Sequence, residues 1–251
     1  MQDLPINEDF LEFNKKLVDD GGTCEYKIDD KGEVAAIFLS SASMKKAYKD
    51  ADVPLLQVDT TFQVESSHYK VVGVCYLDPK IKSSAAICLA LVDRETKENL
   101  EFVFEELKKI IGKKEMIFVC DKDFTEMDSI RKVFKNCRIL LCRFHVVKYV
   151  KSIISTAVVD KVKKEAILSI FKHVVWSRSR DDYEKYSKSL LAEAADIEVF
   201  PPGNQVKVYF NNYFIERWAS CKDMWAAYCR GQLVTLGDNT NNRIERRVNC
   251  I

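Results

Sequence analysis

Two aspartates stand where neighbouring strands would bring them together. Asp59 interrupts the apolar run Leu55–Phe62, and Asp121 directly follows the apolar run Met116–Cys120. A carboxylate at a buried strand position is costly unless it is paired or binds a metal ion. Ligands of open α/β sheets bind beyond the carboxyl ends of the strands, so adjacent strands would place both carboxylates in one crevice. Such hard oxygen ligands suit Mg²⁺ or Mn²⁺, and two ions held there can activate water against a phosphodiester.

The same two aspartates also have an ordinary structural explanation. Asp59 could cap a local turn, and Asp121 could cap the helix that follows it. Asp123 competes for that cap and is also the alternative metal ligand. Spacing alone slightly favours the structural explanation over the metal site.

A third acid, Glu245, lies in the polar run 239–247. On a helix, Asn241 and Asn242 would lie one turn before Glu245 and roughly on its face. The run also holds three arginines. A glutamate beside arginines is usually a surface ion pair, so Glu245 alone is a weak signal.

Cys142 and His145 have a C-x2-H spacing, and a thiolate and an imidazole so placed can share a zinc ion. A structural zinc site needs four ligands. Cys137, Cys221 and His173 could complete it, although none lies at a telling spacing. From the residues alone, zinc is less favoured than a packed pair in which His145 is hydrogen-bonded.

The elements that must position these residues follow a clear order. Three strand-like runs over short connections predict an antiparallel meander. Alternating helices and strands come next, the first helix having apolar residues at helical spacing. The predicted elements are strands at 55–64, 70–76 and 84–92, a helix at 97–111, a strand at 116–120, a helix at 124–134 and a strand at 138–142. This order predicts a ribonuclease H-like α/β fold, in which helices cover a mixed sheet of the three-strand meander plus parallel strands.

The rest of the chain predicts four parts. Residues 1–50 form a lead-in of a hairpin and a helix, 51–150 the sheet core, 151–235 a helical insertion, and 236–251 a short glutamate helix that completes the core. Residues 145–190 carry ten Lys and Arg against five Asp and Glu. A solvated helical face is the usual explanation, and nucleic-acid contact is the alternative. The aromatic region 206–230 is predicted to be helical, with its rings in a core rather than on a base-stacking surface.

Composition excludes several classes of protein. Of the 251 residues, 47% are hydrophobic and 31% charged, which excludes disordered and collagen-like chains. Lys and Arg number 39 and Asp and Glu 38, so net charge names no partner. The chain shows no signal peptide, no run long enough to span a membrane, and no Gly-rich phosphate loop or serine-hydrolase elbow. Its nine cysteines, an odd number, indicate reduced thiols, and hence the nucleus or cytoplasm rather than secretion.

Taken together, the motifs resemble those of Mutator-like transposases. Leu56–Phe62 resembles the D-x-T strand of that family, and Phe118–Phe124 resembles its second-aspartate motif. Cys142–His145 matches its C-x2-H element, while Arg217–Trp218 and Thr240–Glu245 resemble its tryptophan and its glutamate helix. The Asp-Lys-Asp-Phe form of the second motif is most similar to the SWIM-type zinc-finger proteins derived from such transposases. The resemblance covers roughly residues 22–250.

The resemblance implies a ribonuclease H-like fold with a helical insertion before the glutamate helix. It also implies a DDE-type acidic triad of Asp59, Asp121 and Glu245, and ancestral DNA strand transfer with Mg²⁺ or Mn²⁺. The chain departs from the family because it stops six residues after Glu245 and has neither the downstream SWIM module nor an amino-terminal DNA-binding zinc finger. A fragment, a short isoform or a decayed copy is therefore expected.

Three functions remain open at this point. The favoured hypothesis is a domesticated domain that binds DNA or a nuclear protein partner without transposition. The second is an active divalent-metal-dependent nuclease or strand transferase. The third is a non-catalytic protein-interaction scaffold that uses the aromatic region 206–230. The sequence indicates no oligomeric state.

Overall fold

The chain folds into two compact units. The computed structural model describes residues 8–63, 69–112, 115–203 and 205–231. Within these ranges the first unit ends at Ile139 and the second begins at Leu140. The glutamate helix predicted at 236–251 lies outside the described residues. In the described part of the chain, no helix is both long and apolar enough to cross a membrane.

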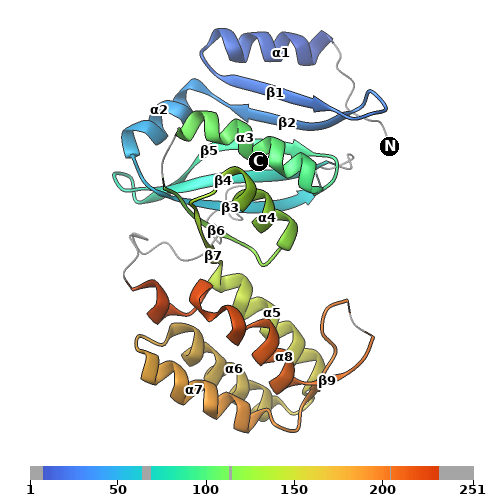
Figure 1. Cartoon of the computed structure of the whole chain (residues 1–251), viewed down its shortest axis with the longest axis vertical. Coiled ribbons are helices and arrows are strands. Elements are labelled where there is room, and N and C mark those ends of the chain that lie inside the picture. Colours follow the sequence, from blue (N-terminus) through green and yellow to red (C-terminus); the bar gives the residue numbers. More distant parts are fainter. Residues whose placement is uncertain (1–7, 64–68, 113–114, 204, 232–251) are drawn as a thin grey trace. The chain divides into compact units, whose positions relative to one another are not determined.

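The first unit is built on a seven-stranded mixed sheet with the order β1-β2-β5-β4-β3-β6-β7 (Figure 1). β3, β4 and β5 form the predicted antiparallel meander, and β6 pairs with β3 in parallel. The expected mixed sheet is therefore confirmed. The strands are β1 (Thr23–Ile28), β2 (Val34–Ser40), β3 (Leu55–Gln63), β4 (Lys70–Asp78), β5 (Ser83–Val92), β6 (Ile117–Cys120) and β7 (Arg138–Leu141).

The amino-terminal hairpin extends this sheet. β1 and β2 pair in antiparallel fashion, and β2 continues the sheet by pairing with β5. The turn between β1 and β2 is closed by Asp29, whose carboxylate accepts hydrogen bonds from the amides of Lys31 and Glu33. Helix α1 (Glu8–Asp19) covers the hairpin with Phe10 and Leu17. The lead-in is thus the edge of the sheet.

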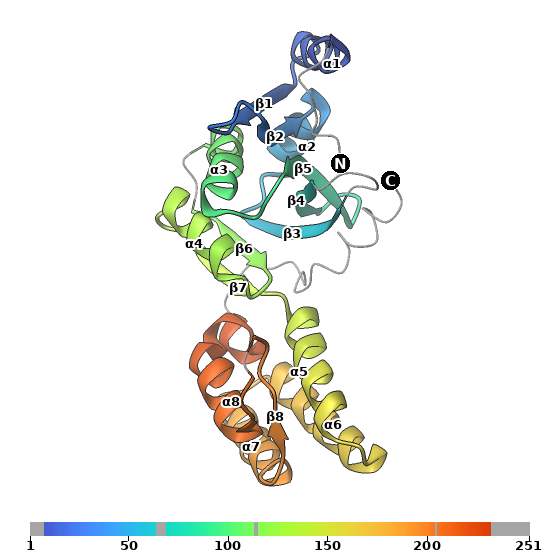
Figure 2. The ribbon, with the colours of Figure 1, turned by 90° about the vertical axis from the view of Figure 1, so that its right-hand side faces the viewer.

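Three helices complete the first unit, and side chains cap each of them. They are α2 (Ala42–Ala51), α3 (Lys97–Ile111) and α4 (Phe124–Val133). The hydroxyls of Ser41 and Thr96 accept the capping hydrogen bonds of α2 and α3. α3 buries the apolar stripe that includes Leu100, Phe104 and Leu107, as its spacing predicts. α3 and α4 pack side by side over the same face of the sheet (Figure 2).

The second unit is mainly helical. α6 packs against both α5 and α7, and a two-stranded sheet joins β8 to β9. Its elements are α5 (Arg143–Ala157), α6 (Lys161–Trp176), α7 (Arg180–Glu193), β8 (Glu198–Val199), β9 (Val208–Tyr209), α8 (Phe210–Arg217) and the 3-10 helices η1 (Ala219–Met224) and η2 (Ala227–Arg230).

The aromatic region forms the core of the second unit. Phe210, Phe214 and Trp225 are fully buried, and Trp218 is nearly so, whereas Tyr209 is exposed. The predicted core role is confirmed for most of these rings. The predicted continuous helix over 206–230 is wrong, because only 210–217 are α-helical. Beyond Trp218 the chain continues as the 3-10 helix η1, and the carbonyl of Trp218 accepts hydrogen bonds from the Cys221 amide at 3.2 Å and from the Trp225 indole at 2.9 Å.

Candidate functional site

Asp59 is a buried residue in the body of β3. It is 4% exposed and pairs with Gly73 of β4 in the middle of the meander. It is therefore not a turn residue, and the turn-capping explanation of Asp59 is wrong. A carboxylate inside a sheet carries a desolvation cost that a bound cation would offset.

Asp121 follows β6, the strand next to β3. The two strands are parallel, and their last paired residues are Gln57 and Val119. Continuing this register by two residues brings Asp121 beside Asp59. Residues in register on neighbouring strands project to the same face of a sheet. We therefore expect the two carboxylates to emerge together, and their sharing of one ion stays a prediction.

Helix α4 is capped by Asp123 and not by Asp121. The Asp123 carboxylate accepts a hydrogen bond of 2.9 Å from the backbone amide of Glu126. The capping explanation of Asp121 is therefore wrong. Because Asp123 is exposed and serves as the cap, it is the weaker choice as the alternative ligand.

The sequence interpretation missed a buried acid beside these aspartates, Glu126 in the first turn of α4. Glu126 is 4% exposed, and one of its carboxylate oxygens accepts a hydrogen bond of 3.2 Å from the hydroxyl of Thr60 on β3. The other oxygen, Oε1, is buried without a hydrogen bond among the described residues. Helical spacing could have revealed it, because Glu126 lies one turn before Ile130 and shares its buried face.

The environment of Glu126 favours its neutral form. Burial, together with the charges of Asp121, Asp123 and Asp59, raises the pKa of its carboxyl group to about 8, against the lowering effect of the hydrogen bond from Thr60. Adjacent residues of a strand point to opposite faces, so Thr60 and Glu126 lie on the face opposite to the Asp59 side chain. We therefore regard Glu126 as a buried acid on the other face of the sheet, and not as a further ligand of a metal ion held by the two aspartates.

Cys142 and His145 come together at the start of α5. Cys142 is the N-cap residue, His145 lies in the first turn, and both are buried. The Cys142 sulfur and a His145 ring nitrogen lie within 4.8 Å of each other. A zinc ion bound to both would hold these atoms about 3.6 Å apart, so a small adjustment would allow the pair to chelate.

Two of the candidate completions of a zinc site, Cys221 and His173, do not join this pair. The Cys221 thiol donates to the carbonyls of Arg217 and Trp218, and the ring of His173 stacks on Tyr186. Among the described residues of the second unit, no other Cys, His, Asp or Glu comes close enough to Cys142 and His145 to form a group of three. The pair alone is half of a four-ligand site.

Buried Arg230 holds the chain just before Cys142. Its guanidinium donates hydrogen bonds to the carbonyls of Leu141 and Met224, so it ties the start of α5 to the end of η1. Arg143 is also buried, and this burial lowers the pKa of its guanidinium. Two buried arginines therefore lie near Cys142. Arg143 follows it in the sequence, and Arg230 reaches the carbonyl of the preceding residue, Leu141.

Two predicted features give no direct support to a site. Glu245 lies outside the described residues, so the third member of the predicted triad stays a prediction. Trp218, from the Arg217–Trp218 motif, is a core residue whose indole nitrogen donates to the Tyr213 hydroxyl at 3.2 Å. Packing in the core of the second unit therefore accounts for the tryptophan of the Arg217–Trp218 motif.

Comparison with known proteins gives one match. Residues 13–140 match the family model described as "Zinc finger SWIM domain-containing protein 1/3, RNaseH-like domain". The match covers just over half of the chain and includes Asp59, Asp121 and Glu126, whereas Cys142 and His145 lie just beyond it. No curated protein matches the chain.

Proposed function

This chain belongs to the ribonuclease H-like domain family of zinc finger SWIM domain-containing proteins 1 and 3, and from that premise we propose that it binds nucleic acid without transposing it. In this proposal Asp59 and Asp121 hold a divalent cation, Mg²⁺ or Mn²⁺, that contacts a phosphodiester oxygen. DNA in the nucleus is the expected partner.

The observation that carries this proposal is the register of β3 and β6. It supports a shared position for two aspartates, neither of which caps a turn or a helix. Carboxylate oxygens are the donors that Mg²⁺ and Mn²⁺ prefer. A cation there would neutralise both carboxylates and attract a phosphate. The carboxylates of Asp59 and Asp121 would hold the cation, while β3 and β6 fix the spacing of the two carboxylates.

Strand cleavage is the alternative function, and the same two aspartates favour it. Paired carboxylates that emerge from adjacent strands suit two ions that activate water and stabilise a leaving oxygen. Catalysis would also need the third acid, for which Glu245 is the proposed residue. The protein-scaffold hypothesis has less support, because most rings of the aromatic region are buried in the second unit.

Mn²⁺ is expected to tighten binding of a labelled DNA duplex, and Asp59→Asn should remove this gain. The variant keeps the size of the side chain but loses the charge that holds the ion. Fluorescence anisotropy in Mn²⁺ and in EDTA measures the gain, for which we expect about tenfold, or roughly 1.4 kcal/mol. Asp128→Asn on the exposed side of α4 is the matched control.

Equal Mn²⁺ gains in Asp59→Asn and the unaltered protein would contradict the proposal. Gel analysis of the same samples tests the alternative. We expect intact DNA, and nicking that requires both Mn²⁺ and Asp59 would favour the nuclease function instead.

For Cys142 and His145 we propose zinc binding, with about one ion per chain in protein purified without chelator. Cys142→Ser should lose the zinc, and a chelator should lower the thermal stability of the unaltered protein. Cys221→Ser is the control, since its thiol is hydrogen-bonded to backbone carbonyls. Protein without zinc, and with the same melting temperature in chelator, would refute zinc binding.

A further inference from the structure

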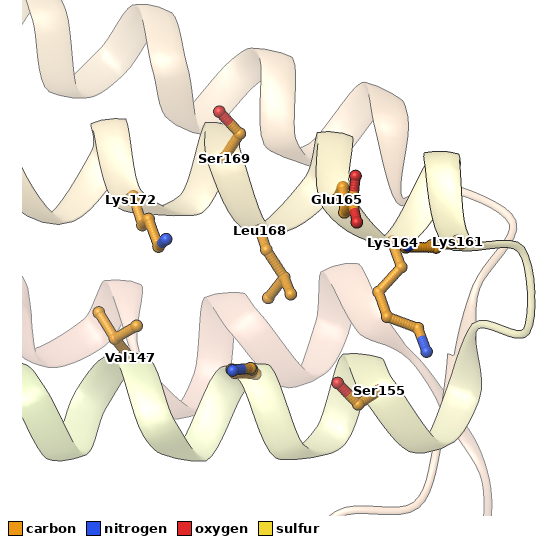
Figure 3. A pocket seen from close by; sticks show the side chains of 9 residues that line it. Val147, Ser155, Lys161, Lys164, Glu165, Leu168, Ser169 and Lys172 are labelled. Atoms are coloured by element: carbon orange, nitrogen blue, oxygen red, sulfur yellow. The ribbon is translucent and has the colours of Figure 1, made fainter.

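A basic groove runs between α5 and α6 in the second unit (Figure 3). Its volume is about 630 Å³, and Leu168 points from α6 towards α5 across it. Polar and charged side chains predominate in its lining. The lining residues are Val147, Lys151 and Ser155 of α5 and Lys161, Lys164, Glu165, Leu168, Ser169 and Lys172 of α6.

The charge of this lysine groove is strongly one-sided. Its lining holds four lysines and one glutamate. None of the four lysines forms an ion pair within the part of the chain that the structure describes. Lys163, on the same helix but outside the lining, pairs instead with Asp196 at 2.8 Å. The lysines that face the groove are therefore available to an external anion, whereas a neighbouring lysine is neutralised.

The spacing of the lysines suits a linear polyanion. Lys161, Lys164 and Lys172 lie along one face of α6, and the eleven residue steps from the first to the last span about 16 Å. Phosphates of one duplex strand advance about 3.4 Å each along the axis, so the row matches roughly five phosphates. Lys151 faces them from α5, and the hydroxyl of Ser155, which points towards α6 in Figure 3, adds a neutral donor.

We propose that the lysine groove binds the sugar–phosphate backbone of a nucleic acid strand. The proposal deepens the proposed function by naming a second contact surface, and it rests on that function only for the class of ligand. Binding at lysines depends on counterion release and needs no divalent cation. The groove and the aspartates therefore make separable contributions.

An acidic peptide is the competing occupant, but the lining favours nucleic acid. A helix that docks in a groove usually places an apolar face on an apolar floor. Here the floor offers only Val147 and Leu168, between lysines and serines. Regularly spaced charges with hydroxyl donors suit phosphates better than a mixed apolar and acidic face.

The test measures binding of labelled single-stranded and duplex oligonucleotides in EDTA as salt is raised. Lys151→Gln with Lys164→Gln should weaken binding about tenfold and lower the slope of log affinity against log salt by about 2. Lys185→Gln with Lys188→Gln on α7 is the matched control, since both lysines lie outside the groove lining. Tryptophan fluorescence checks that each variant is folded, because all three tryptophans lie in the second unit.

Equal losses in the two double variants would overturn the proposal, because they would indicate a general charge effect. Stronger binding of poly-glutamate than of DNA at the same salt would overturn it in favour of an acidic protein partner. Because the groove is tested by salt-dependent binding in EDTA and the aspartates by the Mn²⁺ gain, either proposal can fail without the other.

Discussion

Trp225→Ala is expected to lower the free energy of unfolding of the second unit by about 3–5 kcal/mol. The Trp225 side chain is fully buried, and its ring lies 6.3 Å from that of Phe171 and 6.1 Å from that of Tyr183. The substitution leaves a large cavity and removes the hydrogen bond to the carbonyl of Trp218. Both losses act on the same core, so we expect this to be the largest effect of any single change.

Denaturant unfolding followed by tryptophan fluorescence measures this loss in the second unit alone, because Trp176 and Trp218 remain as probes there. Trp176→Ala is the control. Its ring is 48% exposed, although it lies 5.9 Å from the Arg143 guanidinium, so we expect a loss of about 1 kcal/mol or less. Equal losses in the two variants would contradict a core centred on Trp225.

In EDTA the first unit is expected to lose stability as pH rises from about 4.5 to about 8, because of Glu126. The pKa of its carboxyl group is about 8 in the folded protein, against an ordinary value of 4.5 for an exposed glutamate. In this window the unfolded chain releases the proton while the folded chain keeps it, so unfolding becomes more favourable as pH rises. The slope is about 1.4 kcal/mol per pH unit. Below pH 4.5 both states are protonated, and the effect vanishes.

Glu126→Gln should remove this slope and make the first unit more stable at pH 8 by about 1–3 kcal/mol. The amide can still accept the hydrogen bond from Thr60, but it cannot ionise in the unfolded chain. Unfolding followed by far-UV circular dichroism at several pH values measures the difference, with Glu105→Gln on the exposed face of α3 as the control. Parallel curves of unfolding free energy against pH for Glu126→Gln and the unaltered protein would refute the raised pKa of Glu126.

The sequence by itself determined the order and type of the elements in the sheet. Apolar runs and turn residues located β3, β4, β5 and β6 to within about two residues, because strand periodicity is a local property. Helix starts were similarly local, since the hydroxyls of Ser41 and Thr96 cap residues only three positions away. The family resemblance rested on the same short motifs and was confirmed by the match over 13–140.

Local pattern failed where the packing of distant side chains decides the backbone. Aromatic spacing over 206–230 indicated one helix and correctly placed the rings in a core. The chain instead leaves the α-helix at Trp218, whose carbonyl accepts the indole hydrogen bond of Trp225. Spacing reveals which side is buried, but it does not show where an α-helix gives way to 3-10 turns.

Only the tertiary structure distinguished the two explanations of the aspartates. Asp121 and Asp123 are equally good cap residues by type, and the geometry of α4 assigns the cap to Asp123. The pairing of β3 with β6 joins segments far apart in the chain, and no local signal fixes that register. The burial of Glu126 likewise depends on contact between α4 and Thr60 of β3. The residue types that could do chemistry were visible in the sequence, whereas long-range packing decided which residues lie next to them. The physical reason is that hydrophobic burial sets which elements meet, and the sequence around a single polar residue does not show which element will pack against it.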